Sequence, residues 1–232
     1  MHEAHSFLFR PVNALLEPVL GFEIPDHVIM GFVILLFITA FSFWFRKQIS
    51  QEHPGKMQHM LETIVGGLRG LMEDVIGHGM ARTYLGIIGA FTFFIFLSNI
   101  MGLVFFLNPP TSNPNTTFAL SITAFLFYNT EGIKRHGFFK YLKTLMGPVA
   151  AIGLFMFAVE AISHAVRIVS LGLRLFGNIF GEHTVSGQFS ELLPILVPWP
   201  IMMIGIIGAT MQTFIFIMLT MAYIGGAVGE EH

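Results

Sequence analysis

Apolar residues gather into long runs that are separated by short polar or proline-containing segments. The first run covers 27–45, contains Trp44 near its end and is followed by Arg46 and Lys47, residue types that often mark a membrane boundary. A run of about 20 apolar residues is long enough to cross about 30 Å of hydrocarbon. Residues 27–47 are therefore predicted to form a first membrane span.

Residues 54–79 have a different pattern, in which apolar residues recur at helical spacing with charged residues between them. This pattern predicts an amphipathic helix that either lies on the membrane surface or docks on a partner. The apolar positions are Met57, Met60, Leu61, Ile64, Val65, Leu68, Leu71, Met72, Val75 and Ile76. The charged positions between them are Lys56, Glu62, Arg69, Glu73 and Asp74.

Two further spans are predicted within residues 84–130. The second covers about 84–107 and ends at an Asn-Pro-Pro sequence, because proline interrupts a helix. The third is weaker and runs from Thr116 to about Tyr128. A basic loop at 131–147 is expected to follow it.

The longest predicted helices lie toward the C-terminus, at about 148–184 and 194–227. At about 1.5 Å per residue they would be roughly 50–55 Å long, far more than the hydrocarbon thickness requires. Residues 148–227 are therefore expected to form a long, steeply tilted hairpin. A kink near Gly172 or Gly177 would reduce the tilt that is needed.

The composition supports a polytopic membrane protein. Of the 232 residues, 54% are hydrophobic and 11% are charged, against about 25% charged in soluble domains, and the mean hydropathy is +0.72. The predicted fold is an all-α polytopic membrane protein, with 1–232 as one membrane domain that has five crossings and an amphipathic surface helix. The absence of cysteine excludes disulfides and thiol catalysis, and no basic patch suggests nucleic acid as a partner.

The basic residues predict how the chain is oriented. The 131–147 loop holds four of them, whereas the 108–115 loop holds no charge. By the positive-inside rule, the N-terminus lies outside and the C-terminus inside. Residues 1–26 lack a charged start and a small-residue cleavage site, so they are expected to be an outer segment rather than a cleaved signal.

One arginine, Arg174, lies within about forty mostly apolar residues, in the sequence Ser-Leu-Gly-Leu-Arg-Leu-Phe-Gly-Asn at 170–178. An arginine does not lose its proton in a protein. At the bilayer centre it costs about 3 kcal/mol on insertion scales and far more in simulations. Such a charge indicates a functional residue.

A stripe of polar residues shares the face of Arg174 on an ideal helix. Given the predicted orientation, Glu160 lies toward the inside and Glu182 and His183 toward the outside, with Arg174 between them. Two polar pockets, each open to one side and separated by a fixed positive charge, would admit protons without a continuous leak. Gln212, on the following helix, is expected to hydrogen-bond Arg174. The stripe consists of Glu160, Ser163, Arg167, Ser170, Arg174, Asn178 and Gln188.

Simpler structural roles compete with this interpretation. Polar side chains in a membrane bundle often only bond neighbouring helices, which would equally explain Ser163, Ser170 and His164. Glu160 and Arg167, seven residues apart, would then form a structural ion pair. Exposed histidines are expected to be surface residues rather than metal ligands.

The order of Arg174, Asn178 and Gln212 resembles that in the a subunit of the bacterial F-type ATP synthase. The likeness is specific because these three residues occur at family-like separations. It extends more loosely over 96–104 and 113–117, and so covers nearly all the chain after the first span. The length and the five predicted crossings agree with it.

The resemblance implies roles for individual residues. Arg174 matches the stator arginine that faces an ionised carboxylate on each c-ring subunit. Asn99, Asn178 and Gln212 match polar residues that line the ion path, and Glu160 matches an acidic position on the inner side.

The outer half-channel departs from the family pattern. His183 occupies a position where relatives carry glutamate or histidine, although Glu182 would take that place if one residue is missing here. Many relatives have histidine or glutamate where this chain has Gly205, and some have aspartate in place of Gly102. The outer path is therefore expected to depend on Glu182, His183 and water.

The resemblance implies a proton-conducting stator in the bacterial plasma (inner) membrane. Its expected partners are the c-ring, the subunit b peripheral stalk, the other membrane-sector and catalytic-head subunits, and the lipid bilayer. Protons would pass Glu182, His183 and Asn178 from outside and leave past Ser170 and Glu160. No cofactor or metal is expected, and no nucleotide motif is present, so ATP chemistry belongs to partner subunits. The sequence does not decide between proton and sodium coupling.

Two other classes of function would each need a sequence feature of their own. A self-contained ion channel or secondary transporter would need its own cycling carboxylate or inverted repeats. A metal-dependent intramembrane enzyme would need a cluster such as His-Glu-x-x-His. The sequence shows neither feature.

Overall fold

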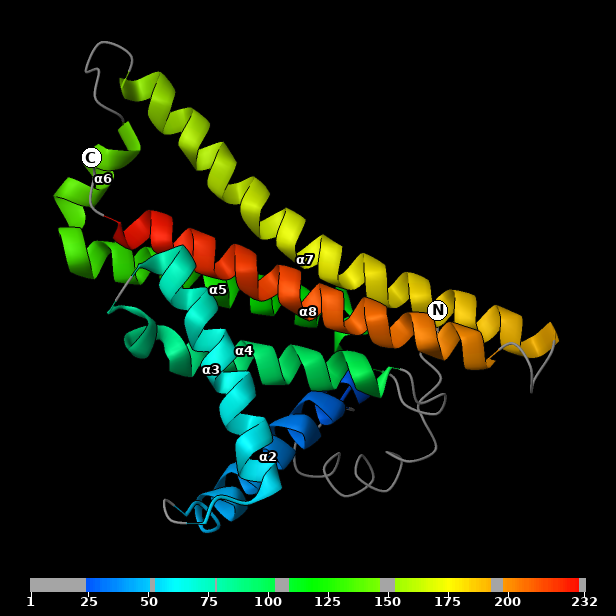
Figure 1. Cartoon of the computed structure of the whole chain (residues 1–232). Coiled ribbons are helices and arrows are strands. Elements are labelled where there is room, and N and C mark those ends of the chain that lie inside the picture. Colours follow the sequence, from blue (N-terminus) through cyan, green and yellow to red (C-terminus); the bar gives the residue numbers. More distant parts are fainter. Residues whose placement is uncertain are drawn as a thin grey trace.

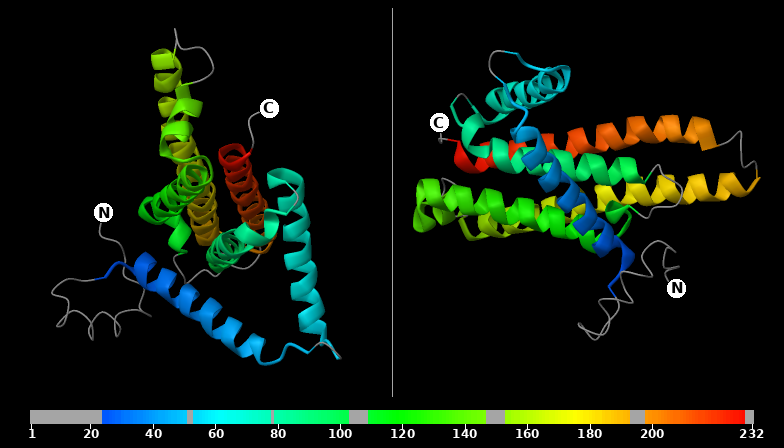
Figure 2. Two further views of the ribbon diagram at one scale, coloured as in Figure 1. Left: turned by 90° about the vertical axis from the view of Figure 1, so that its left-hand side faces the viewer. Right: turned by 90° about the horizontal axis from the view of Figure 1, so that it is seen from below.

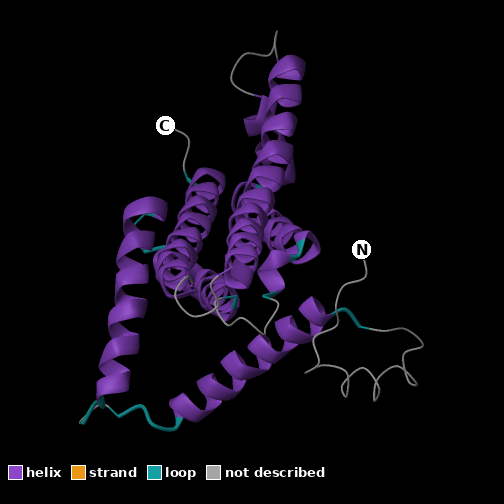
Figure 3. Ribbon diagram, turned by 90° about the vertical axis from the view of Figure 1, so that its right-hand side faces the viewer, coloured by secondary structure: helices purple, strands orange, loops and turns teal. Residues whose placement is uncertain are grey.

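The structure, a computed structural model, is helical throughout the part of the chain that it describes (Figure 3). The described residues are 24–50, 53–77, 79–102, 109–146, 153–192 and 198–229. They form seven α-helices and a short 3-10 helix: α2 (Asp26–Arg46), α3 (Lys56–Ile76), α4 (Ala81–Met101), η1 (Pro110–Ser112), α5 (Pro114–His136), α6 (Phe138–Met146), α7 (Gly153–Leu192) and α8 (Pro198–Val228).

Four of these helices lie side by side and contain most of the core. Figures 1 and 2 show α4, α5, α7 and α8 running roughly along one direction, with α7 and α8 adjacent and opposite in sense. The rings of Phe91 and Phe216 pack 5.7 Å apart between α4 and α8. Leu171 and Leu175 of α7 are buried in the same cluster. The described bundle is thus held by apolar side chains from all four helices.

The predicted first span is confirmed as a helix. α2 ends at Arg46, and it buries Ile29, Met30 and Ile34 against α4. Phe32 and Phe43 are exposed on its other side, as expected for a helix whose outer face contacts lipid. α2 crosses the four-helix group at a steep angle (Figure 2).

The amphipathic helix predicted at 54–79 is confirmed as α3, and the structure shows where half of its apolar stripe packs. Leu68, Met72 and Ile76 are buried against α4 and α8, whereas Met57 and Met60 remain exposed. The second half of α3 therefore docks on this chain itself. Figure 1 shows α3 lying across α4 and α8 rather than along them.

Four helices are long and apolar enough to cross a membrane: α2, α4, the Phe155–Glu182 part of α7 and the Met203–Val228 part of α8. The third predicted span forms α5 but is not among these four. It carries Thr117, Ser121 and Tyr128, all buried against the protein. These three polar residues face other helices, which contributes to the weak hydropathy signal of α5.

The prediction of a loop at 131–147 was wrong in its local structure. α5 continues past Tyr128 to His136, and α6 follows after one glycine turn at Gly137, whose φ is +81°. The ion pair between Lys134 and Glu131, 2.6 Å long, lies within the last turns of α5. Basic residues at a helix C-terminus also interact favourably with its dipole, so these charges stabilise a helix end.

α7 is longer than predicted and is not interrupted. It extends to Leu192 and passes Gly172 and Gly177 as continuous helix, although it curves along its length (Figure 1). At Gly172 α7 approaches α5 closely, since a Cβ there would lie 3.0 Å from a ring carbon of Phe118. The predicted helix starts at 148 and 194, and the predicted end of the second span at 107, lie outside the described residues.

Candidate functional site

The polar residues of α7 meet α8 in a regular antiparallel register. Asn178 Nδ2 donates a hydrogen bond of 2.6 Å to Gln212 Oε1. Four residues further along α7, Glu182 Oε2 lies 3.5 Å from where a Cβ on Gly208 would be, four residues earlier on α8. Polar groups thus line one seam between the two helices.

The predicted bond between Gln212 and Arg174 was wrong. Gln212 is only 2% exposed, and its side-chain oxygen accepts the hydrogen bond from Asn178, one helical turn beyond Arg174. Arg174 is exposed, and it makes no hydrogen bond or ion pair with any residue that the structure describes. The reason is geometric, because the Asn178 amide faces Gln212 across the seam while the guanidinium lies outside it.

Arg174 interrupts an exposed apolar surface. On α7 its neighbours along the exposed side include Leu173, and Phe214 and Met211 are exposed on α8. The exposed large apolar residues around this level are Val166, Val169, Leu173, Phe180, Met211 and Phe214. A large exposed apolar patch marks a protein or membrane contact. Arg174 is thus a fixed cation within this surface, and no described Asp or Glu side chain pairs with it.

On the predicted outer side, Glu182 is half-buried on the seam with α8. Gly208 has no side chain, which leaves room for the Glu182 carboxylate. The side chain of His183 lies outside the described residues. The structure therefore places the Glu182 carboxylate beside α8, about one helical turn from the Asn178–Gln212 pair.

Asn99 connects three elements in the interior. Its Oδ1 accepts a hydrogen bond of 2.9 Å from Thr111 Oγ1 in η1, and its Nδ2 lies 3.5 Å from the carbonyl oxygen of Ala209 in α8. Ala209 is less than one turn from Gln212 along α8. Thr111 was missed in the sequence, and only its place after two prolines at a helix end marks it out.

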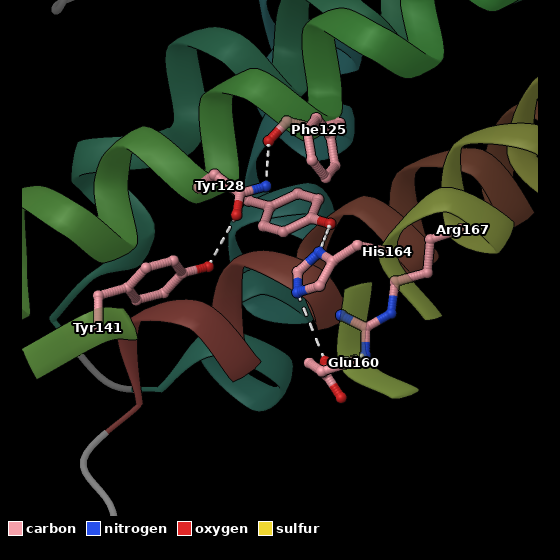
Figure 4. Close-up of polar contacts among 7 residues, drawn as sticks. Phe125, Tyr128, Tyr141, Glu160, His164 and Arg167 are labelled. Carbon is pink, nitrogen blue, oxygen red and sulfur yellow. Dashed lines mark hydrogen bonds and ion pairs between the residues drawn. The ribbon is translucent and has the colours of Figure 1, made fainter. Parts of the chain in front are cut away.

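On the predicted inner side, Glu160 is the centre of a polar cluster (Figure 4). Its Oε1 accepts a hydrogen bond of 3.3 Å from Arg167 Nη2 and lies 3.4 Å from His164 Nε2. His164 Nδ1 is in turn 2.7 Å from the hydroxyl of Tyr128 on α5. The contacts expected for the simpler structural roles are present here, since Glu160 pairs with Arg167 and His164 bonds a neighbouring helix.

Arg167 extends this cluster to α8. Its guanidinium carbon lies 5.2 Å from the ring centre of Tyr223, which is within the range of a cation–π contact. Ser170 donates a hydrogen bond of 3.2 Å to the carbonyl oxygen of Arg167, within its own helix. The contact with Tyr223 is therefore the one that holds the Arg167 guanidinium at the seam with α8.

Tyr141 joins α6 to the same end of the bundle. Its hydroxyl donates to Asn129 Oδ1 at 2.9 Å. Burial raises the pKa of Tyr141, so its hydroxyl keeps its proton and remains a donor near neutral pH. Among the described residues, no three His, Asp or Glu side chains gather as they would around a metal ion.

Comparisons with known proteins agree along almost the whole chain. The profile of a family described as ATP synthase A chain matches residues 27–225. A protein named ATP synthase subunit a from Geotalea uraniireducens is 36% identical over 230 residues, which cover 98% of this chain and 99% of that protein. ATP synthase subunit a 3 from Pelobacter propionicus is 38% identical over 231 residues, with the same coverage. ATP synthase subunit a from Geobacter sulfurreducens is 36% identical over 230 residues.

Proposed function

Since this chain belongs to the ATP synthase A chain family, we propose that it is the proton-conducting stator, with Arg174 as the fixed charge between two half-channels. The observation that carries the proposal is the exposure of Arg174 in an apolar surface without a partner among the described residues. An ionised carboxylate on a neighbouring ring of subunits supplies the opposite charge. Within the complex, the c-ring is this neighbour and subunit b is a further partner.

The mechanism follows from the position of Arg174 between two polar groups. A proton from outside passes Glu182, His183 and Asn178 and neutralises a c-ring carboxylate, which can then rotate into lipid. After nearly a full turn the carboxylate meets Arg174, loses its proton, and the proton leaves past Ser170 and Glu160. Moving one charge through 100 mV yields only about 2.3 kcal/mol, so many passages are needed for one ATP. A rotating ring accumulates them.

Asn178 and Gln212 support this division of the proton path into an outer and an inner part at Arg174. Their 2.6 Å hydrogen bond ties α7 to α8 one turn from Arg174, and it keeps two amide groups in a fixed orientation where a proton approaches the ring. Asn99 lies behind them in the interior. We assign it to the wall of the outer path.

The membrane arrangement we propose has five crossings, with α7 and α8 as a tilted hairpin. The apolar part of α7 has 28 residues and is about 42 Å long. To lie within about 30 Å of hydrocarbon it must tilt by about 45°. α2 crosses these helices at a steep angle (Figure 1), so the two sets cannot all be upright. At this tilt the 22 residues from Glu160 to Glu182 span about 23 Å along the membrane normal, which places Glu160 in one half of the membrane and Glu182 in the other.

We propose that this single domain lies in the bacterial plasma (inner) membrane with its C-terminus inside. Lys134, Arg135, Lys140 and Lys143 all lie at the corner where α5 meets α6, and this corner would face the cytoplasm. α3 would then lie on the inner surface, as its direction across α4 and α8 suggests (Figure 2).

The chain purified alone and inserted into lipid vesicles is expected to conduct no protons. A self-contained channel or transporter, the alternative function, would conduct without partners. The measurement is the decay of a pH gradient in vesicles that contain the chain alone, compared with vesicles that contain the complete membrane sector. Conduction by the isolated chain at the rate of the complete sector would contradict the proposal.

Replacing Glu182 with glutamine is expected to slow proton pumping more than replacing His183 with alanine. Glu182 lies on the seam beside Gly208, and we propose that it is the outer proton relay. A positioned acid or base contributes about a hundredfold or more to proton transfer, so a loss of roughly that size is expected in ATP-driven acidification of inverted membrane vesicles. The opposite ranking of the two variants would assign the relay to His183.

A further inference from the structure

His164 is held between two residues of different helices at the inner end of the bundle. Figure 4 shows its ring between the Tyr128 hydroxyl and the Glu160 carboxylate. The distances are 2.7 Å from Nδ1 to the hydroxyl and 3.4 Å from Nε2 to Glu160 Oε1. The His164 side chain is only 12% exposed, whereas that of Glu160 is 33% exposed. His164 thus connects the interior to a carboxylate near the surface.

The chemistry of the three groups gives the contact a direction. An ionised carboxylate can only accept a hydrogen bond, and a neutral imidazole has one donor and one acceptor nitrogen. The proton therefore belongs on Nε2, facing Glu160, and Nδ1 accepts from the Tyr128 hydroxyl. The acceptor-only carboxylate of Glu160 thus sets the tautomer of His164, and the Tyr128 hydroxyl, which can donate, matches it.

Packing keeps the ring in this orientation. The rings of His164 and Tyr128 are stacked, with centres 5.7 Å apart and an angle of 21°. The ring of Phe125 meets that of His164 edge-on at 5.8 Å. All of these restraints come from α5, so α5 fixes the direction in which the α7 histidine presents its N–H group.

Glu160 is approached from a second side as well. Arg167 Nη2 donates to the same Oε1 atom at 3.3 Å, and Arg167 lies over Tyr223 of α8. The charged and titratable groups around His164 are therefore Glu160 and Arg167 on α7, Tyr128 on α5 and, through Arg167, Tyr223 on α8. The Arg167 hydrogen bond and the 3.4 Å contact with His164 Nε2 together restrict where the Glu160 carboxylate can lie.

We propose that His164 is a positioning residue for proton release on the inner side, which holds the Glu160 carboxylate through an N–H group oriented by Tyr128. This inference rests on the proposed function, because Glu160 is useful to position only if protons leave past it. Without the histidine, the Glu160 carboxylate would be held by Arg167 alone. Proton release would then be slower, although the complex would still assemble.

The test uses variants of His164 in the complete complex, in inverted membrane vesicles. In His164→Gln the amide nitrogen can replace Nε2, whereas in His164→Asn it can replace only Nδ1, and His164→Leu keeps volume without polar groups. We expect His164→Leu and His164→Asn to lower ATP-driven acidification per assembled complex about fivefold, the factor usual for one hydrogen bond. His164→Gln is expected to restore most of the rate. An equal loss of acidification rate in His164→Gln and His164→Leu, or a normal rate in His164→Leu, would overturn the proposal.

A double-mutant comparison separates positioning from a purely structural role. In a Glu160→Gln background, His164→Leu should cause little further loss, since interacting residues are not additive. If His164 only joins α5 to α7, its replacement would cost the same factor in both backgrounds. Tyr128→Phe keeps the stacked ring, and it should lower the rate in the same direction even if His164→Leu fails to assemble.

The Arg174→Ala variant, measured beside these, keeps the two hypotheses apart. Normal pumping by Arg174→Ala would contradict the proposed function itself. A block in Arg174→Ala together with normal pumping by assembled His164→Leu would contradict only the role of His164.

Discussion

Replacing Arg174 with alanine is expected to abolish both ATP-driven proton pumping and proton-driven ATP synthesis, while the complex still assembles. Arg174 is exposed, and its loss removes no hydrogen bond or ion pair with any other described residue. What it removes is the charge that forces the ring carboxylate to give up its proton. Acidification of inverted vesicles and ATP synthesis under an imposed gradient measure the two directions.

Two controls sharpen the test of Arg174. Arg69 is an exposed arginine on α3 that pairs with Glu73 at 2.9 Å, and exposed pairs contribute only about 0–1 kcal/mol. Arg69→Ala should therefore pump at the normal rate. Arg174→Lys should recover little activity, because an ammonium lacks the planar guanidinium fork and can lose its proton when buried.

Assembled Arg174→Ala complexes are also expected to leak protons after the catalytic head is removed. Without the fixed charge, nothing separates the outer group around Glu182 from the inner group around Glu160. Normal coupled pumping by Arg174→Ala, with the same amount of subunit in the membrane, would refute the assignment of Arg174 as the stator charge.

The sequence was sufficient to predict features that depend on one helix at a time. Apolar runs located α2 and α4, and the spacing of apolar residues located α3. The helical wheel also placed Glu160, Arg167 and Asn178 on one face of α7, and the structure shows all three in polar contacts. Each of these features follows from local spacing, which is independent of how the helices pack.

Features that depend on the offset between helices could not be read from the sequence. A helical wheel gives the face on which Gln212 lies but not which residue of α7 is opposite it. The sequence therefore suggested Arg174 as its hydrogen-bond partner, whereas the partner is Asn178. Tyr128 was likewise missed, because it meets His164 from 36 residues away. The axial offset between α5 and α7 is set by packing. Gly172, at their contact, lets the two helices approach closely.

The weak apolar signal of α5 has the same origin. Ser121 and Tyr128 are buried against other helices, so hydropathy alone underestimates a helix that never faces lipid on that side. The charges after Tyr128 suggested a loop for a similar reason. Only the Glu131–Lys134 pair and the turn at Gly137 show that the helix continues and then turns.

Replacing Gly172 with leucine is expected to remove most of the folded subunit from the membrane. Gly172 is buried at the contact between α7 and α5, where a Cβ alone would lie 3.0 Å from Phe118 Cδ1 and 3.1 Å from Ser121 Oγ. A leucine side chain adds three further carbons to that contact. Overpacking of this kind costs about 1–3 kcal/mol and occasionally more. Pushing α5 and α7 apart would also separate Tyr128 on α5 from His164 on α7.

Gly177→Leu is the matched control, because a Cβ at Gly177 of the same helix would meet nothing within 4 Å. Both substitutions gain the same helix propensity, about 1 kcal/mol over glycine, so the comparison isolates the contact with α5. The measurements are the amount of subunit in purified membranes and its melting temperature in detergent. Gly177→Leu should match the unsubstituted chain in both, whatever it does to the passing ring. If Gly172→Leu is as abundant and as stable as Gly177→Leu, then α5 and α7 do not pack as closely as described, and the Tyr128–His164 contact loses its support.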